Sequence, residues 1–245
     1  MCFFYALSQT AQSLKNRYQL ADDFIFELGP ELSGPIYYVS GFDFPKMPVL
    51  TNEQPARLQV FRWGLVPSWV KTAAQAAEIR AKTLNARAET VLEKPSFRQA
   101  IRRRRCLVPA NGFYEWRAFR GQKYPYYIFL KDRTVFSFAG IWEEWVDPAT
   151  GERLRTYSIL TTTANPLLAK IHNTKQRMPV ILPRERERAW LADELSTDEI
   201  IALLQPFPAA AMAAHPISRL ITARTANRNC PEVQAPFAYP ELGEG

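Results

Sequence analysis

Short apolar runs rich in tyrosine, phenylalanine, valine and isoleucine recur along the chain, and turn-forming stretches such as RGQK and DPATGE separate some of them. Runs of this kind are typical of β-strands joined by hairpins. Several runs are apolar at consecutive positions, which indicates strands covered on both faces. We expect strands in 35–42, 57–66, 106–116, 124–132, 134–145, 155–163, 177–183 and 215–221.

Helical patterns are fewer and shorter than the strand patterns. One covers 95–105, where a proline occupies the first turn and apolar residues share one face, and two more cover 183–193 and 196–205. Hairpin-linked strands with few helices predict an α+β fold, in which several short helices pack around a mainly antiparallel, barrel-like β core. No linker is visible, so we expect a single domain over 1–245 with a proline-rich tail from about residue 231.

Composition limits the functional classes. The 245 residues include three widely spaced cysteines (Cys2, Cys106 and Cys230) without a CxxC pair, so we expect no disulfide framework, no zinc site and no cofactor. There is no signal-peptide pattern and no apolar run of membrane-spanning length, and we expect a soluble cytoplasmic protein.

The formal net charge of +7 fits a polyanionic partner such as nucleic acid, although a charge surplus that only aids solubility explains it equally well. The arginine run 102–105 is the densest basic stretch of the predicted helices. We interpret it as a solvated helix face.

Four stretches place ionisable or polar groups in strand-like apolar context. They are Cys2, the alternating polar residues of NARAE at 85–89, Glu115 between two aromatic residues, and His172. Each has an ordinary structural explanation when taken alone. A cysteine can begin a buried strand, a glutamate can pair with an arginine across a sheet, and a lone histidine is usually a satisfied polar group. The combination is more informative.

Together these stretches resemble the SRAP family (SOS-response-associated peptidases), whose members form DNA–protein crosslinks at abasic sites. The matching segments occur in the family's order over nearly the whole chain. They are Met1-Cys2, WGLVPSW at 63–69, NARAET at 85–90, NGFYEW at 111–116, ILTTTAN at 159–165, IHNTKQRMPVIL at 171–182 and HPIS at 215–218.

The resemblance implies an active site built around the N-terminus. Cys2 is the expected nucleophile once Met1 has been removed, and Asn85, Glu115 and His172 complete the site. The implied activity is that of a sensor of abasic sites in single-stranded DNA. Its thiazolidine crosslink shields the lesion in DNA repair and the SOS response.

The resemblance also implies a DNA-binding surface, with Arg87, Thr161 and Arg177 as contacts. Trp69 either stacks on an exposed base, as aromatic residues of single-strand binders do, or packs in the core. We expect the partner to be single-stranded DNA with abasic sites. The protein itself is expected to be a monomer, associated with the nucleoid if the source is bacterial.

The chain departs from the family pattern beside the nucleophile. Phe3 and Phe4 follow Cys2 where the family has glycine and arginine, VSGF stands at 39–42 in place of an Ala-Pro-Gly turn, and Val70 replaces a second tryptophan. The arginine is a phosphate ligand in the expected site. Phe4 therefore either faces the DNA groove, which we favour, or packs in the core.

The expected chemistry suits an N-terminal cysteine. A primary amine captures the ring-opened aldehyde of an abasic site as an imine, and the neighbouring thiol closes a five-membered thiazolidine that prevents strand cleavage. Two alternatives stay open. One is an N-terminal-nucleophile thiol peptidase, including self-cleavage of the Met1–Cys2 bond, with Asn85 as an oxyanion donor. The other is a DNA-binding module without chemistry.

Overall fold

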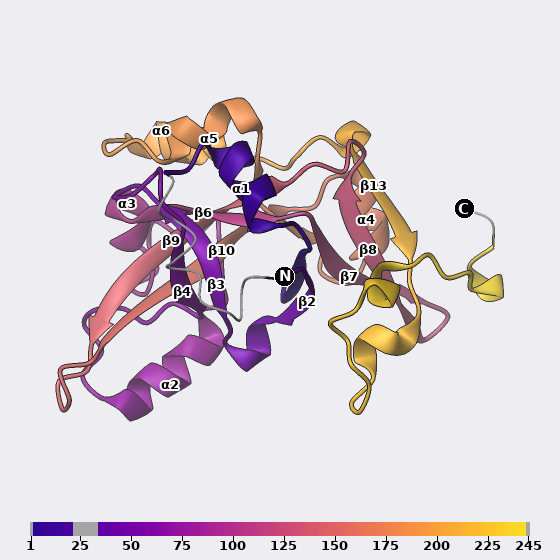
Figure 1. Ribbon diagram of the computed structural model, residues 1–245, viewed down its shortest axis with the longest axis horizontal. Coiled ribbons are helices and arrows are strands. Elements are labelled where there is room, and N and C mark those ends of the chain that lie inside the picture. Colours follow the sequence, from indigo (N-terminus) through magenta and orange to yellow (C-terminus); the bar gives the residue numbers. More distant parts are fainter. Residues whose placement is uncertain (1, 22–33, 244–245) are drawn as a thin grey trace.

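Two β-sheets lie side by side with helices around them (Figure 1). The structure is a computed structural model and describes residues 2–21 and 34–243. The α+β fold with a mainly antiparallel, barrel-like core is confirmed. The extent of a single domain over 1–245 stays a prediction.

Five strands of the larger sheet close into a barrel. Going around it, β10 pairs with β4, β4 with β3, β3 with β6, β6 with β9, and β9 again with β10. All pairs are antiparallel except β10 with β4. The strands are β3 (Lys46–Thr51), β4 (Gln59–Trp63), β6 (Arg105–Ala110), β9 (Phe136–Val146) and β10 (Arg153–Thr163).

Three short strands extend the barrel at one end. β5 (Asn85–Arg87) runs parallel to the last part of β10, and β11 (Arg177–Pro179) pairs antiparallel with the same part from the other edge. β12 (Ile181–Leu182) pairs with β9. The end of β10 therefore brings segments that are distant in sequence to one place.

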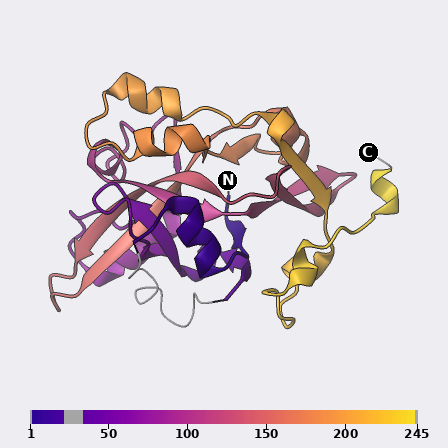
Figure 2. The same ribbon diagram turned by 45° about the horizontal axis from the view of Figure 1, so that its top comes forward.

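The smaller sheet is antiparallel throughout, in the order β13, β8, β7, β1, β2. Figures 1 and 2 show β1, in indigo, between the barrel and the outer strands of the smaller sheet. The strands are β1 (Phe4–Leu7), β2 (Ile36–Ser40), β7 (Gly112–Phe119), β8 (Gln122–Leu130) and β13 (Met212–Pro216).

Helices cover the barrel from opposite sides. In Figure 1, α1, α5 and α6 lie above it and α2 lies below it. The α-helices are α1 (Ala11–Tyr18), α2 (Ala73–Lys82), α3 (Ala100–Arg103), α4 (Pro166–Ile171), α5 (Arg184–Trp190) and α6 (Thr197–Leu203). Short 3-10 helices are η3 (Gly41–Asp43), η4 (Ala209–Ala211), η5 (Arg219–Thr222), η6 (Pro231–Gln234) and η7 (Pro240–Leu242). Among the described residues, no helix has the length and apolar character needed to cross a bilayer.

A shared aromatic core joins the two sheets. Tyr5 of β1 packs edge-on against Trp63 and Phe138 of the barrel, with ring centroids 5.2 and 5.8 Å apart. Its hydroxyl is hydrogen-bonded to that of Tyr157 at 3.0 Å. Buried aromatic pairs of this kind contribute about 0.5–1.5 kcal/mol beyond their apolar area. They hold β1, and with it the start of the chain, against the barrel.

The arginine run 102–105 is a solvated face only in part: Arg102 and Arg103 of α3 are exposed, whereas Arg104 is half-buried. Arg105 begins β6 and is fully buried. Its guanidinium donates to the main-chain carbonyls of Trp190, Ile101 and Arg102 at 2.9, 3.0 and 2.7 Å. A buried arginine is tolerated when such acceptors satisfy its donors.

Other boundaries also differ from the prediction. Only Ala100–Arg103 of the expected helix 95–105 is α-helical. The run 106–116 is divided between β6 and β7. The expected strand 215–221 ends at Pro216, and η5 follows it.

The elements that the hydrophobic pattern did not predict include α1, α2, α4 and β3. The sequence of α2 is alanine-rich with a single buried residue, so it lacks an apolar stripe. β3 contains Pro48, a residue that normally argues against a paired strand.

Candidate active site

Cys2 lies two residues before the start of β1 and is completely buried. Its thiol donates a weak hydrogen bond to the Phe4 carbonyl at 3.7 Å, and the Phe3 carbonyl accepts a bond from the Gly41 N–H at 2.8 Å. Burial raises the pKa of the Cys2 thiol well above its ordinary value, with a smaller contribution from the charge of Glu115. The sulfur is therefore a thiol, not a thiolate, at neutral pH.

Asn85 ties Cys2 to the barrel. It lies in β5, opposite Ile159 of β10, and is buried. Its side-chain Nδ2 donates to the Cys2 carbonyl at 2.9 Å. Because Asn85 belongs to the larger sheet and Cys2 leads into the smaller one, this bond fixes the start of the chain across the junction between the sheets.

Glu115 is a buried carboxyl on β7, with only 4% of its surface exposed. Successive strand residues face opposite sides, so Glu115 shares a face with Phe113, which lies in the core cluster that contains Cys2. Burial raises the pKa of Glu115 to about 8. The group is consequently a protonated acid at neutral pH.

His172 ends α4 and lies beside Glu115. Its Nδ1 is 2.9 Å from the Arg177 carbonyl and 3.6 Å from Oε1 of Glu115. A carbonyl only accepts, so Nδ1 carries the hydrogen and the lone pair of the neutral ring is on Nε2. Burial lowers the pKa of His172 to about 4. Between about pH 4 and pH 8 the pair is therefore an uncharged acid beside an uncharged base.

A cleft of about 430 Å³ opens onto this pair. Its lining includes Phe3, Phe4 and Trp116 as well as Glu115 and His172. The structure thus brings the four expected catalytic residues together at the junction of the sheets. Asn85 contacts Cys2, and Glu115 lies beside His172. The cleft gives access to Glu115 and His172.

The expected DNA contacts differ in accessibility. Arg87 is exposed, whereas Thr161 is completely buried. The Arg177 guanidinium forms a two-pronged ion pair with Glu89, and it also donates to the Thr161 carbonyl at 2.7 Å. Arg177 therefore has its charge balanced, and its carbonyl orients His172. Thr161 is thus not on the surface, whereas Arg177 is partly exposed.

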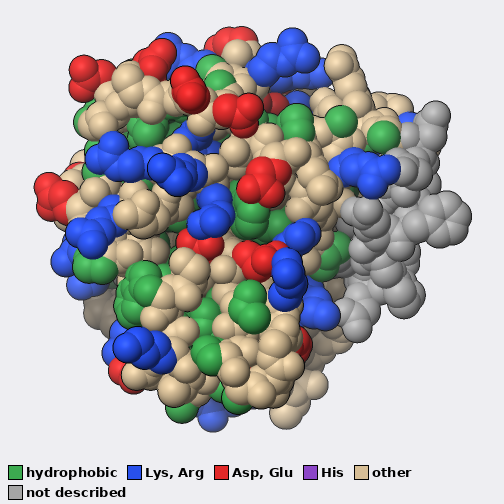
Figure 3. Space-filling model, turned by 90° about the vertical axis from the view of Figure 1, so that its left-hand side faces the viewer, with side chains coloured by type: hydrophobic (Ala, Val, Ile, Leu, Met, Phe, Trp, Pro, Cys, Tyr) green, Lys and Arg blue, Asp and Glu red, His purple; other side chains and the backbone are tan. Residues whose placement is uncertain are grey.

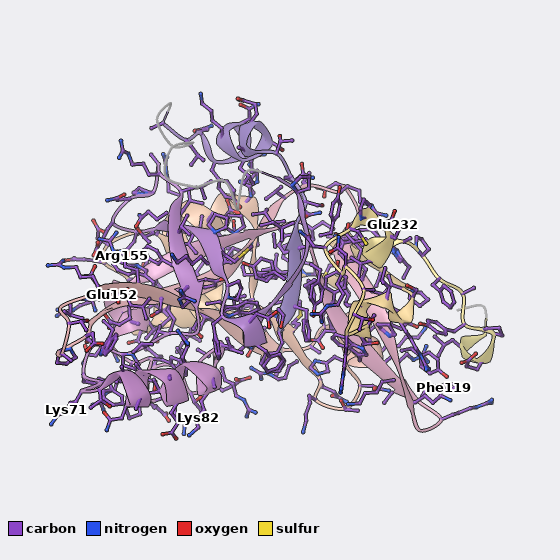
Figure 4. The ribbon with its side chains drawn as sticks, turned by 60° about the horizontal axis from the view of Figure 1, so that its bottom comes forward. Lys71, Lys82, Phe119, Glu152, Arg155 and Glu232 are labelled. Atoms are coloured by element: carbon purple, nitrogen blue, oxygen red, sulfur yellow. The ribbon has the colours of Figure 1, made fainter. Side chains whose placement is uncertain are left out.

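Trp69 is on the surface, with 55% exposed, so the core alternative is wrong. It lines a second hollow of about 710 Å³ beside α2. Lys71 and Lys82, at the two ends of α2, also line this hollow. Figure 4 shows them on the opposite side of the molecule from Phe119, which marks the β7–β8 turn.

Phe4 is half-buried, which combines the two alternatives considered for it. It lines the cleft and at the same time packs against Tyr38 at 5.7 Å and Trp116 at 5.2 Å between ring centroids. Lys123 and Lys175 also line the cleft, and sequence reasoning did not select them. Lys123 belongs to a turn signal and Lys175 to the segment after His172, where isolated lysines carry no distinguishing pattern.

On the face that Figure 3 shows, positive charge is not gathered into one patch. Figure 3 shows the face that carries α2, where Lys and Arg side chains are interspersed with Asp and Glu. In the described part of the chain, no group of three His, Cys, Asp or Glu residues is arranged to hold a metal ion.

Several known proteins are similar to this chain in sequence and in fold. The family model described as "SOS response associated peptidase (SRAP)" matches residues 1–224. The abasic site processing protein YoqW of Bacillus subtilis is 41% identical over 187 residues, which are 76% of this chain and 79% of that protein. The abasic site processing protein HMCES of Rattus norvegicus is 35% identical in an alignment of 204 positions, which covers 71% of this chain and 55% of that protein.

A crystal structure of a protein from Bacteroides thetaiotaomicron superimposes with a TM-score of 0.90 at 42% identity, covering 97% of this chain and all of that one. The match to the family model extends over the segments that supply Cys2, Asn85, Glu115 and His172. The chain therefore belongs to the SOS response associated peptidase family.

Proposed function

We propose that this protein processes abasic sites in single-stranded DNA by attaching itself covalently through Cys2 after Met1 has been removed. The names of its relatives support abasic-site processing. The observation that carries the covalent mechanism is the uncharged Glu115–His172 pair beside an N-terminal cysteine that Asn85 holds in place. Met1 lies outside the described residues.

The buried thiol implies an order of steps in which the amine reacts first. His172 Nε2 accepts the proton of the C1 hydroxyl as the sugar ring opens to the aldehyde, and it returns this proton to the ring oxygen, which becomes a hydroxyl. The Cys2 amine attacks the aldehyde carbon, and one proton passes from the nitrogen to the former aldehyde oxygen. Glu115 then protonates the resulting hydroxyl, which leaves as water and gives the iminium. Because its ring is neutral at physiological pH, His172 acts as the proton acceptor, and Glu115 acts as the donor.

The thiol completes the reaction. The Cys2 sulfur adds to the iminium carbon, and the thiol proton passes to the Glu115 carboxylate formed in the previous step. A C–S bond forms, the nitrogen keeps its bond to the same carbon, and Glu115 regains its proton. The net change is the union of protein and DNA with loss of one water.

Intact-mass measurement tests the proposal directly. The processed protein, incubated with a single-stranded oligonucleotide containing one abasic site, should gain the mass of the oligonucleotide minus one water. An undamaged oligonucleotide and one with a tetrahydrofuran analogue, which has no aldehyde, should give no adduct. A protein lacking Met1 that stays unmodified by the abasic oligonucleotide would refute the covalent mechanism and leave non-covalent binding.

Arg87 should contribute to DNA binding through its exposed charge. Each phosphate contact on a single strand contributes about 0.7 to the slope of log K against log salt. Arg87→Ala should therefore lower the slope by about 0.7 in a titration with undamaged single strands, whereas Arg188→Ala on α5 should leave it unchanged. Equal slopes for wild type and Arg87→Ala would remove Arg87 from the binding surface.

A further inference from the structure

Aromatic side chains form a continuous row that begins in the cleft, where Phe3, Phe4 and Trp116 line it, and ends at Phe42, which packs against Phe3 and Phe4 outside the lining. The ring of Phe42 is 4.8 Å from that of Phe3 and 5.8 Å from that of Phe4, measured between centroids. Phe4 in turn packs edge-on against Trp116 at 5.2 Å. We call Phe3, Phe4, Phe42 and Trp116 the aromatic row.

The row is fixed beside the nucleophile. Phe3 and Phe4 directly follow Cys2, and Phe42 lies in η3, whose Gly41 N–H is bonded to the Phe3 carbonyl. Phe42 has 54% of its surface exposed, which makes it one of five exposed large apolar side chains among the residues that the structure describes. Phe42 continues the apolar surface of Phe3 and Phe4, and contiguous exposed apolar surface marks an interaction site, whereas single scattered residues do not.

Two cations accompany the row. Lys123, in the first residues of β8, and Lys175, after His172, line the same cleft and are exposed. Within the part of the chain that the structure describes, neither ammonium group takes part in an ion pair. Aromatic faces together with unpaired cations match a nucleotide, which offers a base to stack and a phosphate to neutralise.

We propose that the aromatic row, with Phe42 at its exposed end, stacks on the nucleobase that flanks the abasic site, and that Lys123 and Lys175 contact the adjoining phosphates. The inference rests on the proposed function, because it takes the strand to be the one that reacts at Cys2. Stacking would give this chain a preference for the base beside the lesion. An arginine at position 4 that binds phosphate would give no such preference. An abasic site with an intact neighbouring base is the favoured substrate, and a purine neighbour is favoured over a pyrimidine because it stacks over a larger area.

The test compares crosslinking rates on oligonucleotides that differ only beside the lesion. The neighbour on each side is adenine, thymine or a tetrahydrofuran residue that has no base. At DNA concentrations below saturation, removing the flanking base should slow adduct formation about fivefold or more, the lower end of base–aromatic stacking effects. Phe42→Ala should remove this dependence, and Phe42→Leu, which keeps apolar bulk, should remove most of it.

A matched control is available in Phe237, another exposed phenylalanine, with 47% of its surface exposed, in the C-terminal tail. Phe237→Ala should retain the wild-type preference, and melting temperatures should show that the variants are folded. Equal rates on all neighbours with the wild-type protein would overturn the stacking proposal while leaving the covalent mechanism intact.

The stacking proposal has a readout that does not need the reaction. Affinities for unreactive tetrahydrofuran oligonucleotides, with and without a flanking base, should show the same preference and the same loss in Phe42→Ala. If no adduct forms with any substrate, the proposed function fails while this binding comparison still decides on the aromatic row. Lys123→Ala and Lys175→Ala should each lower the salt slope of binding by about 0.7; unchanged slopes would remove the lysines from the proposal.

Discussion

Cys2→Ala should abolish the heat-stable adduct with abasic single-stranded DNA. The variant keeps a primary amine, so it still forms an imine, but without the thiol the imine either hydrolyses or promotes β-elimination. We therefore expect no crosslinked band on a denaturing gel after heating, together with an increase in cleaved strand. Cys2→Ser should give at most a weak and reversible product, because oxygen closes the five-membered ring less favourably than sulfur.

Cys230 supplies the control for Cys2. It is a free cysteine near the C-terminus, outside the core clusters, and Cys230→Ala should crosslink like the wild type. Cys106 is less suitable because it is buried between strands of the barrel, where a Cβ added at Gly140 would lie only 2.7 Å from its sulfur. Equal adduct yields from Cys2→Ala and wild type would show that the thiazolidine mechanism is wrong.

Glu115→Gln should slow adduct formation about 100-fold at pH 7, the lower end of typical general acid–base contributions. The amide cannot protonate the leaving hydroxyl or accept the thiol proton. In the wild type, the reaction requires a neutral amine, whose reference pKa is about 7.7–8.0, and a protonated Glu115, whose pKa is about 8. The rate should therefore pass through a maximum near pH 8, and the decline above that pH should be absent in Glu115→Gln.

Single-turnover rates between about pH 6 and pH 10 measure both effects of the Glu115→Gln change. Glu143→Gln is the matched control, because Glu143 is also a buried carboxyl with a raised pKa but pairs with Arg104. It should lower stability while leaving the pH–rate profile unchanged. If the rate of Glu115→Gln still declined above pH 8, the decline would have to come from a group other than Glu115.

The raised pKa of Glu115 and the lowered pKa of His172 make the stability of the folded protein change with pH in opposite directions. Glu115 has a raised pKa, so its contribution to stability is complete below about pH 4.5 and is lost as the pH rises to about 8. His172 has a lowered pKa, so its contribution is complete above about pH 6.5 and is lost as the pH falls to about 4. Between about pH 4.5 and 6.5 the two slopes oppose each other. Above pH 8, Glu115→Gln should therefore melt at a higher temperature than the wild type.

Much of the fold could be predicted from local pattern, because most strands are apolar runs bounded by turn signals. The exceptions have physical reasons. Arg105 is buried because surrounding carbonyls satisfy its donors, a property of the fold that no sequence window contains. The helix α2 has almost no buried face, so periodicity could not reveal it.

The candidate site could be predicted as a set of residues but not as an arrangement. Cys2, Asn85, Glu115 and His172 were selected through family resemblance, since each alone has an ordinary structural explanation. Their proximity depends on the packing of two sheets, and their protonation states depend on burial. For the same reason the cleft lysines and the partial exposure of Phe4 required the folded structure.

The complete burial of the Cys2 sulfur has a consequence for how the protein persists before it meets a lesion. Oxidants and electrophiles attack the thiolate, and oxidation begins at exposed cysteines of low pKa. The Cys2 thiol is neither exposed nor ionised at neutral pH. Under the proposed mechanism, burial thus protects the Cys2 sulfur from peroxide and disulfide exchange until the neighbouring nitrogen has captured an aldehyde.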